Sequence, residues 1–314
     1  MFQQTIKNFN INFNALGERN TVSSGDLLTG HLSFDITKET KITSITMELK
    51  GGVNVQWSSG SSKNRRHFSA KIEYFKLKSV ILQENNAVGE GTRLQPGTHM
   101  YPFTCQFPRG DFPSSFIGAN GRINYSLTVS IHRSWRMAKD FAVELKYVNR
   151  IDTNQPELHA PLSGINGKTL CCLWCTSGPI SMKVSTEKKA FMPGETVKII
   201  CEFSNGSSRT ATPTVSLQQK QVCYTHNRVS QRWYIKKLVS VFGQPISGET
   251  SGVHTGIVIT IPSATPLTIS NCSIIDVSYL IEVTLRVKYA SDLTVLIPII
   301  LCDTPVDPQP PAYM

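Results

Sequence analysis

The C-terminal segment holds the motif whose spacing points most directly to molecular recognition. Pro310, Pro311 and Tyr313 form a Pro-Pro-x-Tyr sequence within a proline-rich stretch, 303–314. Closely spaced prolines exclude a helix or central strand and favour an extended polyproline II conformation. Such a segment loses little entropy on binding an aromatic groove, where Tyr313 adds a ring and a hydroxyl donor. The motif predicts binding to WW domains, and the alternative is a solvated tail.

Clusters of basic residues form the second set with recognisable chemistry. The chain carries 32 Lys and Arg against 22 Asp and Glu, a net charge of +10. Arg65 and Arg66 follow a Ser- and Gly-rich stretch, and Arg133 and Arg136 follow a long alternating segment. Because guanidinium groups bind carboxylates and phosphates, we expect these four arginines to contact acidic partners or an anionic membrane surface. Ordinary solvated charge is the alternative. Nucleic acid is not expected, since no nucleic-acid-binding motif accompanies the charge.

Residues for catalysis or metal binding are harder to find. The sequence has no G-x-S-x-G, H-E-x-x-H, P-loop or complete G-x-G-x-x-G pattern, so we expect no enzyme and no cofactor. A triad assembled only in three dimensions stays open. Cys171, Cys172 and Cys175 could be half a zinc site, a redox pair or an acylated anchor. No second ligand pair has suitable spacing for zinc, so we interpret them as part of a structural strand that begins a second lobe.

The elements that position these residues are predicted to be strands. Apolar residues recur with a period of two in many segments, most clearly in 123–131 and 275–287. A period of two indicates strands with one buried and one wet face, which is typical of antiparallel sheets. No amphipathic helix of ten or more residues is evident, and Gly and Pro interrupt the chain often. The pattern predicts an all-β fold of two antiparallel β-sandwich lobes.

A non-periodic stretch rich in Gly and Pro divides the chain. We expect an N-terminal sandwich at 1–150, an interdomain linker at 151–170, a C-terminal sandwich at 171–302 and an extended, exposed tail at 303–314.

The two halves also repeat each other. Ser24-Gly25-Asp26 recurs as Pro193-Gly194-Glu195 before a strand, and the segment around Tyr125 recurs around Tyr279. Pro113-Ser114-Ser115 and Pro262-Ser263-Ala264 each precede their tyrosine segment, so we expect them to be equivalent. Repetition in the same order predicts a duplicated sandwich, with Tyr125 and Tyr279 in equivalent inward positions.

Several motifs resemble those of the arrestin family, and within it the α-arrestins, or arrestin domain-containing proteins. In the first half these are Phe103-x-Cys-x-Phe107-Pro108, Phe112-Pro113-Ser114-Ser115-Phe116 and Gly121-Arg122-Ile123-Asn-Tyr125. In the second half they are Cys171-Cys172-x-Trp174-Cys175 through Ile180, Met192-Pro193-Gly194-Glu195, Asn271 through Tyr279 and Leu296 through Ile300. The resemblance covers about 1–302, and the second half looks closest to the vertebrate arrestin domain-containing proteins two to four.

This resemblance implies two curved sandwiches joined by a hinge and a non-catalytic adaptor. Such an adaptor would link the cytoplasmic tails of membrane receptors or transporters to WW-domain HECT-type ubiquitin ligases through Pro310, Pro311 and Tyr313. It would thereby promote cargo ubiquitination, endocytosis and endosomal transport. The alternatives are a ligase-independent endosomal sorting scaffold similar to the arrestin-fold subunit of retromer, a thiol-linked thioredoxin-binding regulator, and an unrecognised hydrolase.

Localisation follows from what the sequence lacks. No segment approaches the roughly 18 to 20 apolar residues that span a bilayer, and the first residues do not resemble a signal peptide. We therefore expect a cytoplasmic protein with reduced thiols, recruited to the inner face of the plasma membrane and to endosomes.

Overall fold

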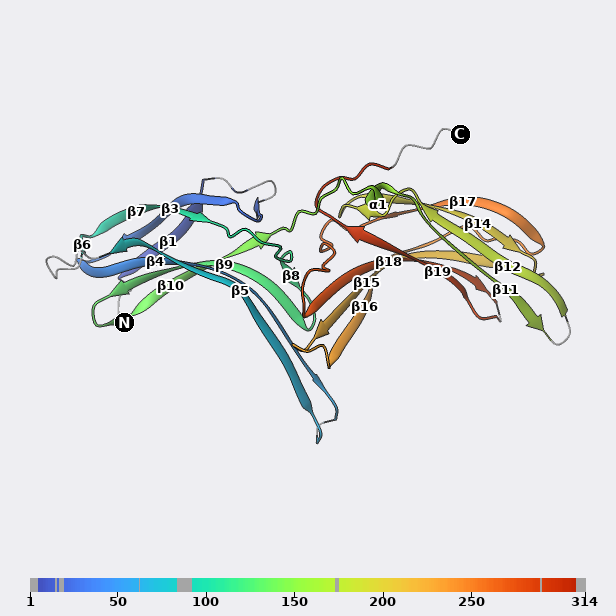
Figure 1. Cartoon of the computed structure of the whole chain (residues 1–314), viewed down its shortest axis with the longest axis horizontal. Helices are drawn as coiled ribbons and strands as arrows, with labels where there is room; N and C mark the ends of the chain where they lie inside the picture. Colours follow the sequence, from blue (N-terminus) through green and yellow to red (C-terminus); the bar gives the residue numbers. More distant parts are fainter. Residues whose placement is uncertain are drawn as a thin grey trace. The chain divides into compact units, whose positions relative to one another are not determined.

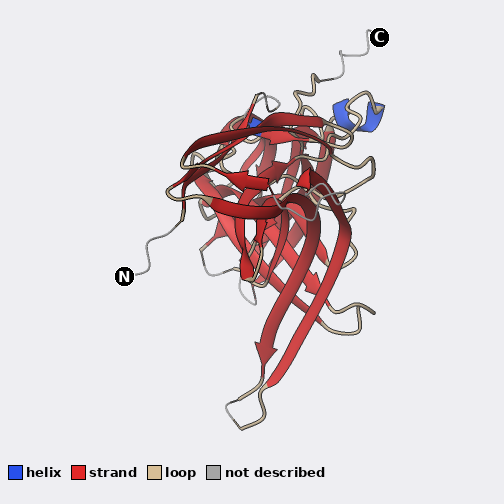
Figure 2. Cartoon of the chain, turned by 90° about the vertical axis from the view of Figure 1, so that its left-hand side faces the viewer, coloured by secondary structure: helices blue, strands red, loops and turns tan. Residues whose placement is uncertain are grey.

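The computed structural model describes residues 5–14, 16, 20–61, 63–83, 92–172, 175–288 and 290–308, with 170–172 and 175–177 described by their backbone alone. The chain forms two compact units, one of residues 1–149 with 224–230 and one of residues 150–223 with 231–314. We call them the N lobe and the C lobe. Strands form nearly all of the regular structure in both (Figures 1 and 2), which confirms the all-β, two-lobe prediction.

The N lobe contains two sheets. Its strands are β1 (Ile6–Phe13), β2 (Thr21–Val22), β3 (Leu27–Ile36), β4 (Thr40–Ser59), β5 (Arg66–Gln83), β6 (Thr92–Leu94), β7 (Gly97–Gln106), β8 (Phe116–Ile117), β9 (Gly121–Arg133) and β10 (Arg136–Tyr147). One sheet has the order β1-β3-β7. The other has the order β2-β10-β9-β4-β5, with β6 added to β4 and β8 to β9.

The C lobe repeats this arrangement. Its strands are β11 (Leu162–Cys172), β12 (Cys175–Thr186), β13 (Ala190–Phe191), β14 (Thr196–Asn205), β15 (Ala211–Tyr224), β16 (Gln231–Phe242), β17 (Thr250–Thr260), β18 (Ile275–Val287) and β19 (Leu293–Leu301). The sheet orders are β11-β12-β14-β17 and β13-β19-β18-β15-β16. In each lobe one two-residue strand pairs in parallel, β2 with β10 and β13 with β19.

The period-two pattern produces the core of each lobe. Along β9 the side chains of Ile123, Tyr125 and Leu127 are each at most 1% exposed, while the residues between them face outward. Along β18 Tyr279 and Ile281 behave in the same way. Alternate side chains of a strand point to opposite faces, so each long strand contributes one face to the space between two sheets.

The predicted internal repeat is confirmed at the level of hydrogen bonds. Gly25 and Gly194 have φ values of 79° and 91°, a left-handed conformation that favours glycine. The acid after each glycine accepts a bond from the backbone N–H three residues earlier: Asp26 from Ser23 and Glu195 from Met192, both at 2.8 Å. The same acid-stabilised turn therefore precedes β3 in the N lobe and β14 in the C lobe.

The proline segments that precede the two tyrosines align differently from the sequence prediction. Ser115 donates its N–H to the carbonyl of Tyr147, and Thr268 does the same to Leu301. The two hydroxyls accept from the same partners, at 2.9 Å and 2.8 Å.

These shared bonds make Ser115 and Thr268 equivalent, so Pro113 corresponds to Pro266. Pro262 corresponds instead to Pro108, because the preceding Phe107 and Ile261 donate to the carbonyls of Asp26 and Glu195. The match of Pro113 with Pro262 was therefore wrong. The equivalent prolines precede their tyrosines by 12 residues in the N lobe and by 13 in the C lobe. The mismatch arose because Pro262-Ser263 has the same residue types as Pro113-Ser114.

The segment expected to be a linker is partly structured. It contains α1 (Pro156–His159), the only helix in the part of the chain that the structure describes, and β11 begins at Leu162. Gly164 and Gly167 concealed this strand from the periodicity, because a glycine carries no side chain to mark a face. No helix of the described residues has the length and apolar character needed to cross a bilayer.

Candidate functional site

The hairpin between β9 and β10 places two of the predicted arginines together. Arg133 ends β9, Arg136 begins β10, and the two pair directly across the hairpin. Ser134 and Trp135 form the turn, with Trp135 at a φ of 59°. Side chains directly opposite in an antiparallel pair lie on the same face, and like charges there repel each other. The hairpin therefore holds two guanidinium groups close together against their mutual repulsion.

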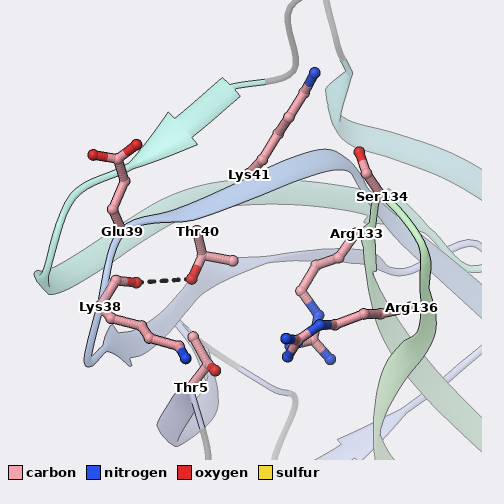
Figure 3. Close-up of a pocket in the computed structure, with 8 residues that line it drawn as sticks. All are labelled: Thr5, Lys38, Glu39, Thr40, Lys41, Arg133, Ser134 and Arg136. Carbon is pink, nitrogen blue, oxygen red and sulfur yellow. Dashed lines mark hydrogen bonds between the residues drawn. The ribbon is translucent and has the colours of Figure 1, made fainter.

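These arginines line an open pocket with a volume of about 170 Å³. The remaining lining residues come from the residue before β1, the β3–β4 turn, the start of β4 and the β9–β10 turn: Thr5, Lys38, Glu39, Thr40, Lys41 and Ser134. In Figure 3 the ammonium group of Lys38 and the guanidinium groups of Arg133 and Arg136 point toward the same space beside Thr5. The carboxylate of Glu39 points away from it.

The positive charge in this pocket is not neutralised by the described carboxylates. Glu39 accepts bonds from Arg93 at 3.0 Å and from Gln95 at 3.3 Å, which holds it outside the cluster. Desolvation, followed by repulsion from Arg136, lowers the pKa of Arg133 below its usual value. The Nε of Arg133 is buried and has no hydrogen-bond partner among the described residues.

A third cationic side chain of the hairpin, Lys139, stabilises the fold through contacts within the N lobe. Lys139 donates to the carbonyl of Ile6 at 2.8 Å and lies 5.1 Å from the centre of the Phe141 ring. Desolvation and then the charge of Arg133 lower the pKa of Lys139. Its presence adds to the positive potential around the pocket. The arrangement is suited to an anion with several acceptor oxygens, because such a group could satisfy Arg133 Nε and relieve the repulsion.

Arg65 and Arg66 lie far from this pocket. Arg66 begins β5 and pairs with Ser59 at one end of β4, whereas Arg133 pairs with Ile42 near the other end. Seventeen residues separate Ser59 from Ile42 on β4, which is roughly 55 Å at the rise of an extended strand. The four arginines that were grouped from the sequence are therefore two separate pairs, and only Arg133 and Arg136 share a pocket.

The tail motif, Pro310, Pro311 and Tyr313, lies outside the described residues. The part of the tail before it differs from the prediction of a fully exposed segment. Val306 is only 2% exposed and packs in an apolar cluster with Leu158, Ala190 and Cys302. The prolines prevent regular strand pairing, as expected, but they do not prevent an apolar side chain from filling a gap on the C lobe.

Polar contacts also hold this first part of the tail. Lys188, 5% exposed, forms an ion pair with the half-buried Glu195 and donates to the carbonyl of Val306. The ring nitrogens of His159 lie 2.6 Å from the carbonyl oxygens of Asp307 and Thr153. The tail motif therefore begins only a few residues beyond a fixed point on the C lobe.

Among the cysteines whose side chains the structure describes, none belongs to a metal or disulfide site. Cys171 and Cys172 end β11, and Cys175 begins β12, with Cys172 paired to Cys175 in the hairpin. Their side chains lie outside the described residues. Burial raises the pKa of the Cys201 thiol to about 12 and that of Cys223 to about 11. No group of potential metal ligands occurs in the described parts of the chain.

Two hydroxyl–imidazole pairs in the N lobe have the residue types of a nucleophile and a base. Ser58 Oγ lies 2.9 Å from His67 Nδ1 near the β4–β5 turn, and Thr46 Oγ1 lies 3.1 Å from His132 Nε2. Both are cross-strand contacts between neighbouring strands, and none of the described carboxylates bonds to either ring. A nucleophile–base pair needs an orienting group and a substrate cleft, so we interpret both contacts as structural.

Sequence reasoning missed Lys38, Lys41 and Trp135 at this site. Lys38 lies in the β3–β4 turn and Lys41 near the start of β4, both more than ninety residues before Arg133, and nothing local indicates that they line one pocket with it. Trp135 did carry a signal, since a large aromatic residue between basic residues in a short turn has little opportunity to be buried. The side chain of Trp135 is fully exposed, and that of Met137 is 90% exposed.

The comparisons with known proteins agree with this architecture. Residues 9–154 match the model for the arrestin (or S-antigen) N-terminal domain, and residues 176–306 match that for the arrestin (or S-antigen) C-terminal domain. Arrestin domain-containing protein 4 of mouse is 29% identical over 292 residues, which are 90% of this chain and 69% of the relative. The human protein of that name is also 29% identical, over 90% of this chain and 68% of its own length. Human thioredoxin-interacting protein is 23% identical over 304 residues, 96% of this chain and 75% of the relative.

Two duplicated antiparallel sandwiches, each matching one arrestin domain, define an arrestin fold. The chain belongs to the arrestin family. Its similarity to arrestin domain-containing protein 4 across most of its length identifies it more narrowly as an α-arrestin.

Proposed function

We propose that this α-arrestin is a non-catalytic adaptor that joins a membrane cargo protein to a WW-domain HECT-type ubiquitin ligase. The observation that carries the proposal is the combination, in one chain, of two arrestin lobes and a Pro-Pro-x-Tyr motif just beyond the anchored Val306. The lobes hold the cytoplasmic tail of a receptor or transporter, and Pro310, Pro311 and Tyr313 hold the ligase. The protein acts in the cytoplasm at the plasma membrane and endosomes, where it promotes endocytosis and endosomal transport.

The anchoring of Val306 gives this adaptor a short connection. Seven residues separate Val306 from Tyr313, and a polyproline II segment extends ~3.1 Å per residue, so the motif reaches roughly 20 Å from its anchor. A short connection keeps the ligase at a high effective concentration near the cargo, which accelerates ubiquitin transfer without any catalytic group on the adaptor. A single motif should bind at micromolar strength, about −8 kcal/mol or weaker.

The alternatives have less support. A ligase-independent sorting scaffold would have no use for the tail motif. A thiol-linked regulator requires a reactive thiolate, whereas burial raises the pKa of Cys105, Cys201, Cys223 and Cys302. Thioredoxin-interacting protein is nevertheless a relative, so a disulfide-linked complex with thioredoxin remains the specific prediction of that alternative.

The test compares the full chain with its Tyr313→Ala variant in titrations against isolated WW domains of HECT-type ligases. Tyr313→Ala should weaken binding by ~2 kcal/mol or more, as aromatic anchors of interfaces do. Ala312→Ser is the matched control and should bind like the native chain, because the x position makes no specific contact. Equal affinity of the native and Tyr313→Ala chains would contradict the proposed ligase connection.

A further inference from the structure

The tip of the β9–β10 hairpin combines features that are rarely found together on a protein surface. Trp135 and Met137 are 102% and 90% exposed, and they flank Arg136, which lines the cationic pocket. Exposing a tryptophan forgoes the large stabilisation that its burial brings. In this hairpin the fold also tolerates an unfavourable φ at Trp135 and two like charges in opposite positions. None of these features stabilises the N lobe, so a binding role explains them better.

The chemistry of the tip is that of a membrane-interface contact. Tryptophan concentrates at the boundary between lipid headgroups and hydrocarbon, since its ring is apolar and its N–H needs a polar partner. Basic side chains beside such an anchor are attracted by the negative potential of an anionic leaflet. Here Ser134 and Arg136, the two neighbours of Trp135, both line the pocket. The apolar and cationic elements are therefore adjacent parts of one surface.

The pocket beside this hairpin tip is suited to binding the phosphate of a lipid headgroup. It has a volume of about 170 Å³, which exceeds the share of several water molecules and accommodates a phosphate group. Lys38, Arg133 and Arg136 converge on it (Figure 3), and Arg133 Nε is buried and unsatisfied among the described residues. A lipid phosphate would supply the missing acceptor while Trp135 enters the interface beside it.

We propose that the β9–β10 hairpin docks the N lobe on an anionic lipid bilayer, with Trp135 and Met137 inserted at the interface and a lipid phosphate held by Lys38, Arg133 and Arg136 in the pocket. The inference rests on the proposed adaptor function only in that the protein works at a membrane. A phosphorylated peptide could also enter the pocket, but it would leave the exposure of Trp135 and Met137 unexplained.

The test is co-sedimentation of the full chain with vesicles of phosphatidylcholine alone or with about 30% phosphatidylserine. We expect binding only to the anionic vesicles, weakened by added salt. Replacing Arg133 and Arg136 by Gln should lower the binding constant about 20- to 30-fold, since each charge near the surface contributes about fivefold. Trp135→Asn should lower it about tenfold, and asparagine tolerates the positive φ, so the turn is retained.

Two matched control variants remove two arginine charges or one exposed tryptophan at positions outside the hairpin. Arg65→Gln with Arg66→Gln subtracts the same charge at the other end of β4, and Trp233→Thr removes another exposed tryptophan, 59% exposed on β16. Both should bind anionic vesicles within about twofold of the native chain. Quenching of tryptophan fluorescence by brominated lipid should occur in the native chain and be largely lost in Trp135→Asn.

Three outcomes would overturn the proposal. The first is no dependence on phosphatidylserine, and the second is an equal loss in the control variants. The third is binding of a phosphorylated peptide that needs Arg133 and Arg136 but not Trp135, without vesicle binding, which would identify the pocket as a peptide site. WW-domain binding by the same chains is measured separately and depends on Tyr313, so failure of the membrane inference is distinguishable from failure of the adaptor function.

Discussion

Tyr125 and Tyr279 are equivalent residues of the two lobes, and each bridges a strand to a proline-containing connection. Tyr125 donates its hydroxyl proton to the carbonyl of Pro113 at 2.7 Å, and Tyr279 donates to that of Pro266 at 2.6 Å. Both rings are almost completely buried. The Tyr279 oxygen also accepts a bond from the side-chain amide of Gln219 at 2.7 Å.

Removing the two hydroxyls should therefore have unequal effects on stability. Tyr125→Phe leaves the Pro113 carbonyl without its Tyr125 donor and should reduce the free energy of unfolding by about 1–2 kcal/mol. Tyr279→Phe also removes the acceptor of Gln219, which is 3% exposed, and should cost about 2–4 kcal/mol. Chemical denaturation of each variant provides the measurement. Tyr234→Phe, at an exposed position on β16, is the control and should change stability by less than about 0.5 kcal/mol.

The paired arginines should be neutral or unfavourable for folding. Arg136→Gln removes the repulsion with Arg133, so the free energy of unfolding should stay constant or rise by up to about 0.5 kcal/mol. Added salt should raise the free energy of unfolding of the native chain more than that of Arg136→Gln. Salt screens the repulsion between Arg133 and Arg136, which the variant lacks. A loss of more than about 1 kcal/mol in Arg136→Gln would show that the arginine stabilises the fold and would weaken the case for a binding site.

Breaking the ion pair of Lys188 should loosen the first part of the tail. Lys188→Met removes the partner of the half-buried Glu195 and the donor to the Val306 carbonyl, and leaving these acceptors unsatisfied should cost about 1–3 kcal/mol. Hydrogen exchange at 303–308 should accelerate in this variant. Lys189→Met is the matched control, since Lys189 contacts Glu157 at 3.2 Å on the surface. If both variants exchange alike, the tail is not held through Lys188.

Stability should fall in alkaline solution. Burial raises the pKa of Cys201 to about 12 and that of Cys223 to about 11 in the folded state, whereas the unfolded thiols ionise near pH 9. Between those values the unfolded state has lost protons that the folded state keeps, so stability is fully present below about pH 9 and is lost as pH rises, by up to about 1.4 kcal/mol per pH unit for each thiol. Denaturation midpoints between about pH 8 and pH 11 measure this slope.

The Cys201→Ala variant separates this effect from general alkaline unfolding. It should show a shallower slope than the native chain, because one of the titrating groups is absent. In addition, Cys201 and Cys223 of the native chain should react slowly with iodoacetamide near pH 8 and rapidly after denaturation. Fast modification in the folded protein would contradict their burial.

The sequence alone was sufficient for most of the strands and for the duplication. Alternation along 123–131 and 275–287 is a local property, because the side chains of a strand alternate between two faces wherever it lies. The turns at Gly25 and Gly194 are local as well. Each consists of four residues, which include the glycine with its left-handed φ, the acid that follows it and the backbone N–H that this acid accepts from. The arrestin fold could be recognised from such segments and their order.

The grouping of the functional side chains was decided only by tertiary structure. Arg133 meets Lys38 because β9 pairs with β4, and this pairing joins residues some ninety positions apart, for which no local pattern exists. Arg66, on β5, pairs with the opposite end of β4 from the end that pairs with Arg133. Two pairs of arginines that look alike in the sequence therefore lie far apart. Val306 was expected in solvent from its proline neighbours, yet it is buried because the C lobe offers an apolar gap beside Leu158 and a donor in Lys188. Burial depends on what other segments bring to a site, and a single segment does not contain that information.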